Sequence, residues 1–326
     1  MKKWNYFLGL GLTVGALTLT ACSDDDEPKT PEVPDLGIKA PVTSMANSDG
    51  VSTFRYNDSG AMTDGTDMYA GKFSINYAPF TVKASDESVG WKEAFEMNNI
   101  VTDGNGFITS ANLTYTGEVN NSDENETWTD TGTLTCQYNA EGQLTKLVSS
   151  VTEDGDMDED TYELTWQDGN IVSIHNVYRY KETGEDWTDD LDQTVTFGYG
   201  ADAVENSGIY MPQMADLDMD FLFYAGRFGK TCKQVPTSMT SREEGSGEYT
   251  VNISVDKDED GRITALKANG QVYYVYAYDG ETATFSPTLL KEILRDEIGF
   301  TGLVFSDDLS MKGAGSSESV ADRARR

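Results

Sequence analysis

Two stretches of this sequence share a pattern that is typical of β-hairpins: residues 138–148 read YNAEGQLTKLV and residues 166–174 read WQDGNIVSI. Each begins with an aromatic residue, continues through an Asn- or Asp-containing turn with glycine, and ends in an apolar strand. Glycine, asparagine and aspartate supply the positive φ angles that tight hairpins need. Residues 255–266, VDKDEDGRITAL, form a third copy without the aromatic residue. The copies predict antiparallel β-hairpins.

The same two-residue period extends outward over residues 51–278. Tyr249, Val251 and Ile253 alternate with polar residues, for example, which places them on one face of a strand. The hairpins recur at irregular spacing, which disfavours a propeller or a solenoid. We therefore predict an all-β fold, an antiparallel β-hairpin meander that forms a barrel or a strongly curved sheet. A single helix-like segment is predicted in this body, at residues 87–97.

The body resembles an uncharacterised family of bacterial surface lipoproteins with a porin-like, all-β fold. The resemblance rests on the YNAEGQLTKLV-type hairpins and on residues 223–236, FYAGRFGKTCKQVP. It implies a fold and no particular activity. The strands are too acidic for the outward apolar band and aromatic girdles of a membrane-spanning barrel, so we expect a domain that stands in water.

Charge and histidine content exclude several classes of function. The 326 residues include 56 acidic and 24 basic ones, for a formal net charge of −32. Such a surface repels phosphate backbones, so we expect no nucleic-acid partner. His175 is the only histidine, which excludes any site that needs two. It has no sequence-local acid and nucleophile, and we expect a half-exposed strand residue.

The amino-terminal residues predict an export signal and a lipid anchor. Residues 1–21 combine a basic start, an apolar run and small residues before Cys22. The sequence Leu-Thr-Ala-Cys resembles a lipobox, which implies lipidation of Cys22; the alternative is a secretory signal cleaved near Ala21. Residues 22–48 form an acidic, proline-containing tether. The acidic run after Cys22 resembles an export tag, so we expect a lipid-anchored outer-membrane protein on the cell surface.

The last part of the chain, residues 281–326, has a different pattern. Ser286 and Pro287 mark a helix start, apolar residues follow at helical spacing, and residues 302–305 (GLVF) suit a buried strand. We therefore predict a short helix–strand appendage. The segment resembles glycoside hydrolase family 3, specifically its bacterial β-N-acetylhexosaminidases, which implies that Asp307 corresponds to the catalytic nucleophile. The family's acid/base histidine loop and most of its barrel have no counterpart, so we expect an inactive fragment.

Two further groups of residues in the β domain, residues 49–280, are candidate sites. Asp256, Asp258 and Asp260 match the first half of a calcium loop, although position twelve is Lys267; the alternative is a solvated hairpin turn. The strand at residues 272–278, VYYVYAY, offers an aromatic platform of Tyr274, Tyr276 and Tyr278, unless these rings only reflect the preference of β-sheets for tyrosine. The sequence leaves open whether Cys136 and Cys232 form a disulfide.

Three hypotheses for function follow. The first, which we favour, is a non-enzymatic surface lipoprotein that binds a glycan or a protein and needs no cofactor. The second is a β-N-acetylhexosaminidase, which the tail alone would suggest. The third is a structural surface protein that binds calcium.

Overall fold

The computed structural model describes residues 41–47, 50–67, 71–88, 91–120, 125–209, 219–243 and 247–278. The predicted signal peptide, Cys22, nearly all of the tether, the helix–strand appendage and Asp307 lie outside the described residues and stay predictions.

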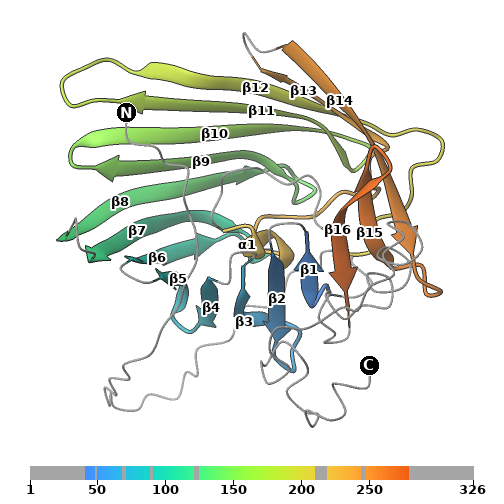
Figure 1. Ribbon diagram of the computed structural model, residues 1–326, viewed down its shortest axis with the longest axis horizontal. Coiled ribbons are helices and arrows are strands. Elements are labelled where there is room, and N and C mark those ends of the chain that lie inside the picture. The colour runs from blue at the N-terminus through green and yellow to red at the C-terminus, as the bar shows by residue number, and fades with distance from the viewer. Residues whose placement is uncertain are drawn as a thin grey trace.

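The described residues form sixteen strands and one short helix (Figure 1). Each strand is antiparallel to its neighbours along the chain, and β16 pairs with β1, so the sheet closes into a barrel. The predicted all-β meander is confirmed, and it takes the barrel form. The strands are β1 (Ser44–Ala46), β2 (Val51–Tyr56), β3 (Met62–Thr66), β4 (Lys72–Tyr77), β5 (Phe80–Ser88), β6 (Trp91–Thr102), β7 (Ile108–Asn120), β8 (Asn125–Tyr138), β9 (Leu144–Glu153), β10 (Asp156–Gln167), β11 (Asn170–Lys181), β12 (Thr188–Gly198), β13 (Ser238–Glu243), β14 (Gly247–Lys257), β15 (Ile263–Ala268) and β16 (Gln271–Ala277).

The prediction of a helix at residues 87–97 is wrong. The segment contains the end of β5 and the first half of β6, which pair with each other from Ser88 and Trp91 inward. The alternation of Trp91, Glu93, Phe95 and Met97 is a strand period, and these four side chains share the inward face. Cross-strand pairing with β5 and β7 overrides the local preference for helix.

Side chains alternate between a largely apolar inner face and a polar outer face. On β8, Leu134 and Cys136 point inward into the core, while five threonines at alternate positions are exposed on the outside. These are Thr127, Thr129, Thr131, Thr133 and Thr135. Within the described ranges, no helix is long and apolar enough to cross a membrane.

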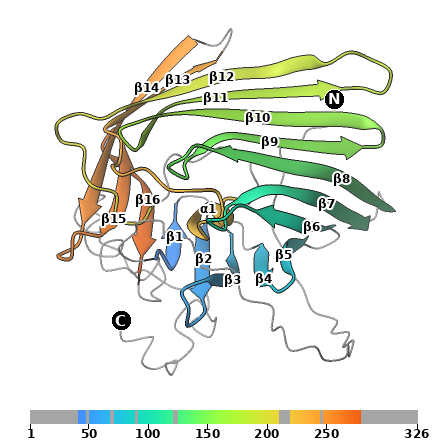
Figure 2. The ribbon, with the colours of Figure 1, turned by 180° about the vertical axis from the view of Figure 1, so that it is seen from behind.

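A short helix and the chain after it pack into the interior of the barrel. Helix α1 (Phe221–Tyr224) lies inside the ring of strands when the molecule is viewed from the front and from behind (Figures 1 and 2). Its four side chains are buried. Phe221 stacks on Phe73 of β4 with ring centroids 4.0 Å apart, and Tyr224 stacks on Phe54 of β2 at 5.1 Å.

Residues 219–237, which we call the plug, dock onto successive hairpin turns at one end of the barrel. The Arg227 side chain donates to the Gly106 carbonyl, Lys230 N–H to the Gly142 carbonyl, and Lys233 N–H to the Gly169 carbonyl. Every third residue of the plug, from Arg227 to Lys233, therefore contacts the next hairpin turn along the sheet. We call this end the plug end; the opposite end, with the hairpins β5–β6 and β7–β8, is the distal end.

The close contact between plug and turns explains why glycine is needed there. A Cβ atom on Gly229 would lie 2.9 Å from the Gly142 carbonyl oxygen, and one on Gly142 would lie 2.9 Å from the Phe107 ring. Both glycines also have positive φ angles. The sequence pattern of hairpin turns and the FYAGRFGKTCKQVP segment are therefore the two halves of one interface.

The structure shows whether Cys136 and Cys232 form a disulfide. Cys136 on β8 and Cys232 in the plug are both buried and are not joined in a disulfide. Burial raises the pKa of both thiols, to about 12 for Cys136, so both are protonated at neutral pH. Both act as small core residues.

Candidate functional site

The predicted tyrosine platform is not exposed. Tyr274, Tyr276 and Tyr278 point into the barrel and are almost completely buried. The Tyr278 hydroxyl donates to the Ile263 carbonyl at 2.8 Å, and burial raises the pKa of the Tyr276 and Tyr278 hydroxyls. The outward residue of this strand is Tyr273, with 52% of its surface exposed. The three inward rings fill the core because they share the face that contacts α1.

The predicted calcium site does not assemble either. The Asp256 carboxylate pairs with Lys267 Nζ at 2.9 Å, and Asp258 pairs with Arg262 Nε at 2.7 Å. The carboxylate of Asp260 lies 3.6 Å from Arg262. The described residues contain no group of three or more acidic, histidine or cysteine side chains placed to hold a metal ion. The alternative, a solvated hairpin turn, describes this segment, because two basic side chains neutralise the carboxylates.

His175 occupies the half-exposed strand position expected for it. It lies on the outer face of β11, where its Nε2 atom is 2.9 Å from Asp192 Oδ1. Glu163, its cross-strand partner, accepts a hydrogen bond from Lys146 Nζ at 2.8 Å, and this bond lowers the pKa of Glu163. Together with Lys146 and Asp192, Glu163 and His175 form a polar row exposed to solvent. Such exposed pairs contribute little to stability and supply no buried nucleophile.

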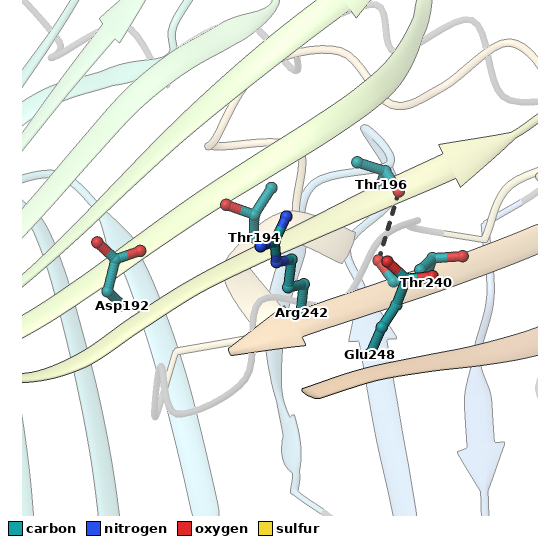
Figure 3. A pocket seen from close by; sticks show the side chains of 6 residues that line it. All are labelled: Asp192, Thr194, Thr196, Thr240, Arg242 and Glu248. Carbon is teal, nitrogen blue, oxygen red and sulfur yellow. Dashed lines mark hydrogen bonds between the residues drawn. The ribbon is translucent and has the colours of Figure 1, made fainter. Parts of the chain in front are cut away.

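A shallow depression lies beside this row on the outer face of β12, β13 and β14 (Figure 3). Its walls are short hydroxyl side chains with one cation and two carboxylates. A hydrogen bond from the Thr196 hydroxyl to the Thr240 carbonyl crosses it. None of its lining side chains is buried, so the depression offers a wet surface rather than an enclosed site. The lining residues are Asp192, Thr194, Thr196, Thr240, Arg242 and Glu248.

The inner wall near the distal end carries a different arrangement of charge. Asp86 on β5 and Glu93 on β6 are direct cross-strand partners on the inward face. Asp86 is only 4% exposed, and its Oδ1 atom has no hydrogen-bond partner among the described residues. The Oε2 atom of Glu93 is likewise buried without a partner there. Buried acceptors of this kind are rare in folded proteins and costly to leave unpaired.

Two tryptophans lie beside these carboxylates. Trp91 shares the inward face of β6 with Glu93, and Trp128 reaches it from β8, with ring centroids 5.3 Å apart. Gly117 on β7 separates them in the sheet, opposite both Glu93 and Trp128. A Cβ atom on Gly117 would lie 1.8 Å from the Trp128 ring, so glycine makes room for the indole. We call Asp86, Glu93, Trp91 and Trp128 the inner acidic site.

Burial dominates the electrostatics of this site. It raises the pKa of Asp86 to about 6, with a further increase from the nearby Asp67 carboxylate. Burial also raises the pKa of Glu93 to about 7; a hydrogen bond from Trp91 lowers it and the Asp86 charge raises it. No lysine or arginine of the described segments forms an ion pair with either carboxylate. Uncompensated carboxylates with displaced pKa values beside aromatic rings are typical of functional sites.

Sequence reasoning missed the inner acidic site. The available signal was the two-residue spacing of Trp91, Glu93 and Phe95, which places a carboxylate on an apolar face. The prediction of a helix at residues 87–97 hides that signal. Asp86 carried no signal of its own, since only the pairing of β5 with β6 brings it opposite Glu93.

Asp86→Asn is expected to stabilise the protein at pH 8 and to have little effect at pH 4. The folded-state pKa is raised, so the fold loses stability as pH rises from the ordinary value near 3.8 to about 6, and the amide removes that loss. We expect a gain of about 1–2 kcal/mol at pH 8, or roughly 2–8 °C in Tm. Thermal unfolding at both pH values measures it. Asp192→Asn, on the exposed outer face, is the control; equal gains in both variants would contradict the prediction.

The carboxy-terminal part of the chain matches a known enzyme family. The model of the glycosyl hydrolase family 3 N terminal domain matches residues 269–326. The match begins in the turn before β16, so its first residues form a strand of the barrel, and the rest lies outside the described residues.

Curated relatives match over short parts of the chain. The chain is 52% identical over 50 residues to a β-hexosaminidase of Vibrio cholerae serotype O1, which covers 15% of each chain. It is 30% identical over 120 residues to a β-hexosaminidase of Photobacterium profundum, which covers 31% of this chain and 36% of the relative. The chain thus spans well under two thirds of these relatives. The expected resemblance to a family 3 fragment is confirmed.

Solved structures match the barrel instead. A porin-like protein from Bacteroides vulgatus ATCC 8482 superimposes with a TM-score of 0.50 at 11% identity, over 74% of this chain and 99% of the other. The barrel has a porin-like fold. A porin-like protein from Bacteroides uniformis ATCC 8492 gives a TM-score of 0.45 at 15% identity, over 74% of this chain and 98% of the other. At these identities the likeness concerns the fold alone.

Proposed function

We propose that this chain is a non-enzymatic lipoprotein of the bacterial surface, anchored through Cys22, that binds a glycan or a protein at the inner acidic site. The observation that carries the proposal is the pair of buried carboxylate oxygens, beside two tryptophans, that have no hydrogen-bond partner among the described residues. Aromatic faces stack against sugar rings and partner side chains, and a few convergent polar groups orient a ligand.

The outer face supports a barrel that stands in water at the end of a lipid tether. The exposed threonines of β8 and the polar row from Lys146 to Asp192 cover the positions where a lipid-embedded barrel carries apolar side chains. Anchoring is tested by Cys22→Ala: we expect the parent protein in the outer-membrane fraction, accessible to protease on intact cells, and the variant released.

Ligand binding is tested with arrays of glycans and surface proteins probed by the mature chain. We expect retention of a subset of ligands, and loss of that retention in Trp128→Ala. Tyr273→Ala, which removes an exposed ring from the outer face, is the matched control and should bind normally. Hits that survive Trp128→Ala, or no hits at all, would contradict the proposed site.

The family 3 segment favours one competing activity, hydrolysis of terminal N-acetylglucosaminides. We infer that this activity is absent, because Asp307 lacks the family's histidine loop as proton donor. Turnover of a fluorogenic N-acetylglucosaminide that disappears in Asp307→Asn would overturn this inference. The hypothesis of calcium binding has no support from the structure, because Asp256 pairs with Lys267 and Asp258 pairs with Arg262.

A further inference from the structure

We propose that the inner acidic site binds the ammonium group of an organic amine ligand. This inference rests on the proposed function, because it names the ligand chemistry of the same site. It begins from Asp86 Oδ1 and Glu93 Oε2, two buried acceptors that no described residue satisfies. A ligand that donates hydrogen bonds and carries positive charge would supply what both oxygens lack.

The geometry of the pair suits one compact cation. Directly opposed residues on antiparallel strands have Cβ atoms about 4.5–5.5 Å apart, so a group between the two side chains reaches both. An ammonium has three donors in a small volume, enough to contact both carboxylates and retain one further bond. The neighbouring Asp67 carboxylate adds negative charge to the same end of the wall.

The surroundings favour an organic cation over a metal ion. Calcium takes six to eight oxygen ligands, whereas no described cluster of three or more metal-ligating side chains forms here. The Trp91 and Trp128 rings supply aromatic faces beside the carboxylates. Aromatic faces attract cations and also contact the carbon atoms that bear an amine. Glycine at position 117 keeps the Trp128 ring against this wall.

The inner acidic site lowers the stability of the unliganded protein, which also indicates that it has a ligand. Two carboxyls with raised pKa values oppose folding at neutral pH, because the fold resists their ionisation. Proteins retain such destabilising groups mainly where function requires them. Replacing both carboxylates by amides should therefore stabilise the empty protein and weaken amine binding, a combination that a purely structural role does not predict.

Matched probes test the ligand chemistry. Glucosamine oligosaccharides carry free amines, whereas N-acetylglucosamine oligosaccharides have the same ring with the amine blocked; 1,5-diaminopentane supplies amines without a sugar. Calorimetric titration at pH 7, where Asp86 is largely ionised and the sugar amines are still partly protonated, is expected to show binding of at least one free-amine probe; 1,5-diaminopentane, which stays fully charged, is also titrated at pH 8. The N-acetylated probe should bind at least tenfold more weakly.

Variants then assign the binding to the site. Asp86→Asn/Glu93→Gln is expected to weaken amine binding at least tenfold and to raise the Tm of the free protein at pH 8. Glu163→Gln/Asp192→Asn makes the same change of charge on the outer face and should bind amines normally. Binding that the inner double variant leaves unchanged, or no binding by any free-amine probe, would overturn the proposal. N-acetylated oligosaccharides that bind equally well, and depend on Trp128, would overturn the amine assignment while the proposed binding function stands.

Discussion

Phe221→Ala is expected to lower the free energy of unfolding by about 3–5 kcal/mol. The Phe221 side chain is buried in α1, and its ring lies nearly parallel to Phe73 of β4 with centroids 4.0 Å apart. Alanine would remove this stacked contact and leave a cavity between the plug and the barrel wall, where a single layer of sheet has little freedom to collapse. For a domain of this size the change corresponds to roughly 6–20 °C in Tm.

Chemical denaturation and thermal unfolding measure this effect. Tyr273→Ala is the matched control, since it removes an aromatic ring that is half exposed on the outer face. We expect that variant to lie within about 0.5 kcal/mol of the parent. A Phe221→Ala protein as stable as the Tyr273→Ala protein would mean that the barrel holds its shape without the plug.

The hairpins were predictable because their determinants are local. The Asn139 and Asp168 turns carry their own glycines, and the flanking strands alternate, so short windows of sequence specify each hairpin. Closure was not predictable in the same way. It depends on the pairing of β1 with β16, which lie at opposite ends of the β domain in the sequence. The sequence therefore left a barrel and a curved sheet as equal alternatives.

The sequence also does not show which face of a strand points into the barrel. Alternation in VYYVYAY separates Tyr274, Tyr276 and Tyr278 from Tyr273, but it does not tell which set points inward. The buried helix α1 decides it, and this four-residue turn has no periodic signal of its own. The same reason hid the inner acidic site, because Asp86 and Glu93 meet only through the register of β5 and β6.

Arg227 is a buried charged residue of the plug. Its side chain is completely buried, and its guanidinium lies over the Tyr77 ring at 4.7 Å and the Phe80 ring at 5.6 Å. Nη1 donates to the Gly106 carbonyl at 3.3 Å, while Nε and Nη2 have no hydrogen-bond partner among the described residues. Two aromatic rings and one carbonyl compensate a buried charge only in part. The side chain therefore stabilises the fold chiefly through the volume that it fills.

Arg227→Ala is accordingly expected to cost about 3–5 kcal/mol, whereas Arg227→Met should cost less than about 1.5 kcal/mol. Methionine keeps most of the volume between Tyr77, Phe80 and the plug and removes a charge that is poorly solvated. Urea denaturation of the two variants beside Lys230→Ala, an exposed position in the same segment, separates packing from charge. If methionine were as destabilising as alanine, the cation–π contacts and the bond to Gly106 would carry the stability, and the guanidinium would be the group that fixes the plug to the turns.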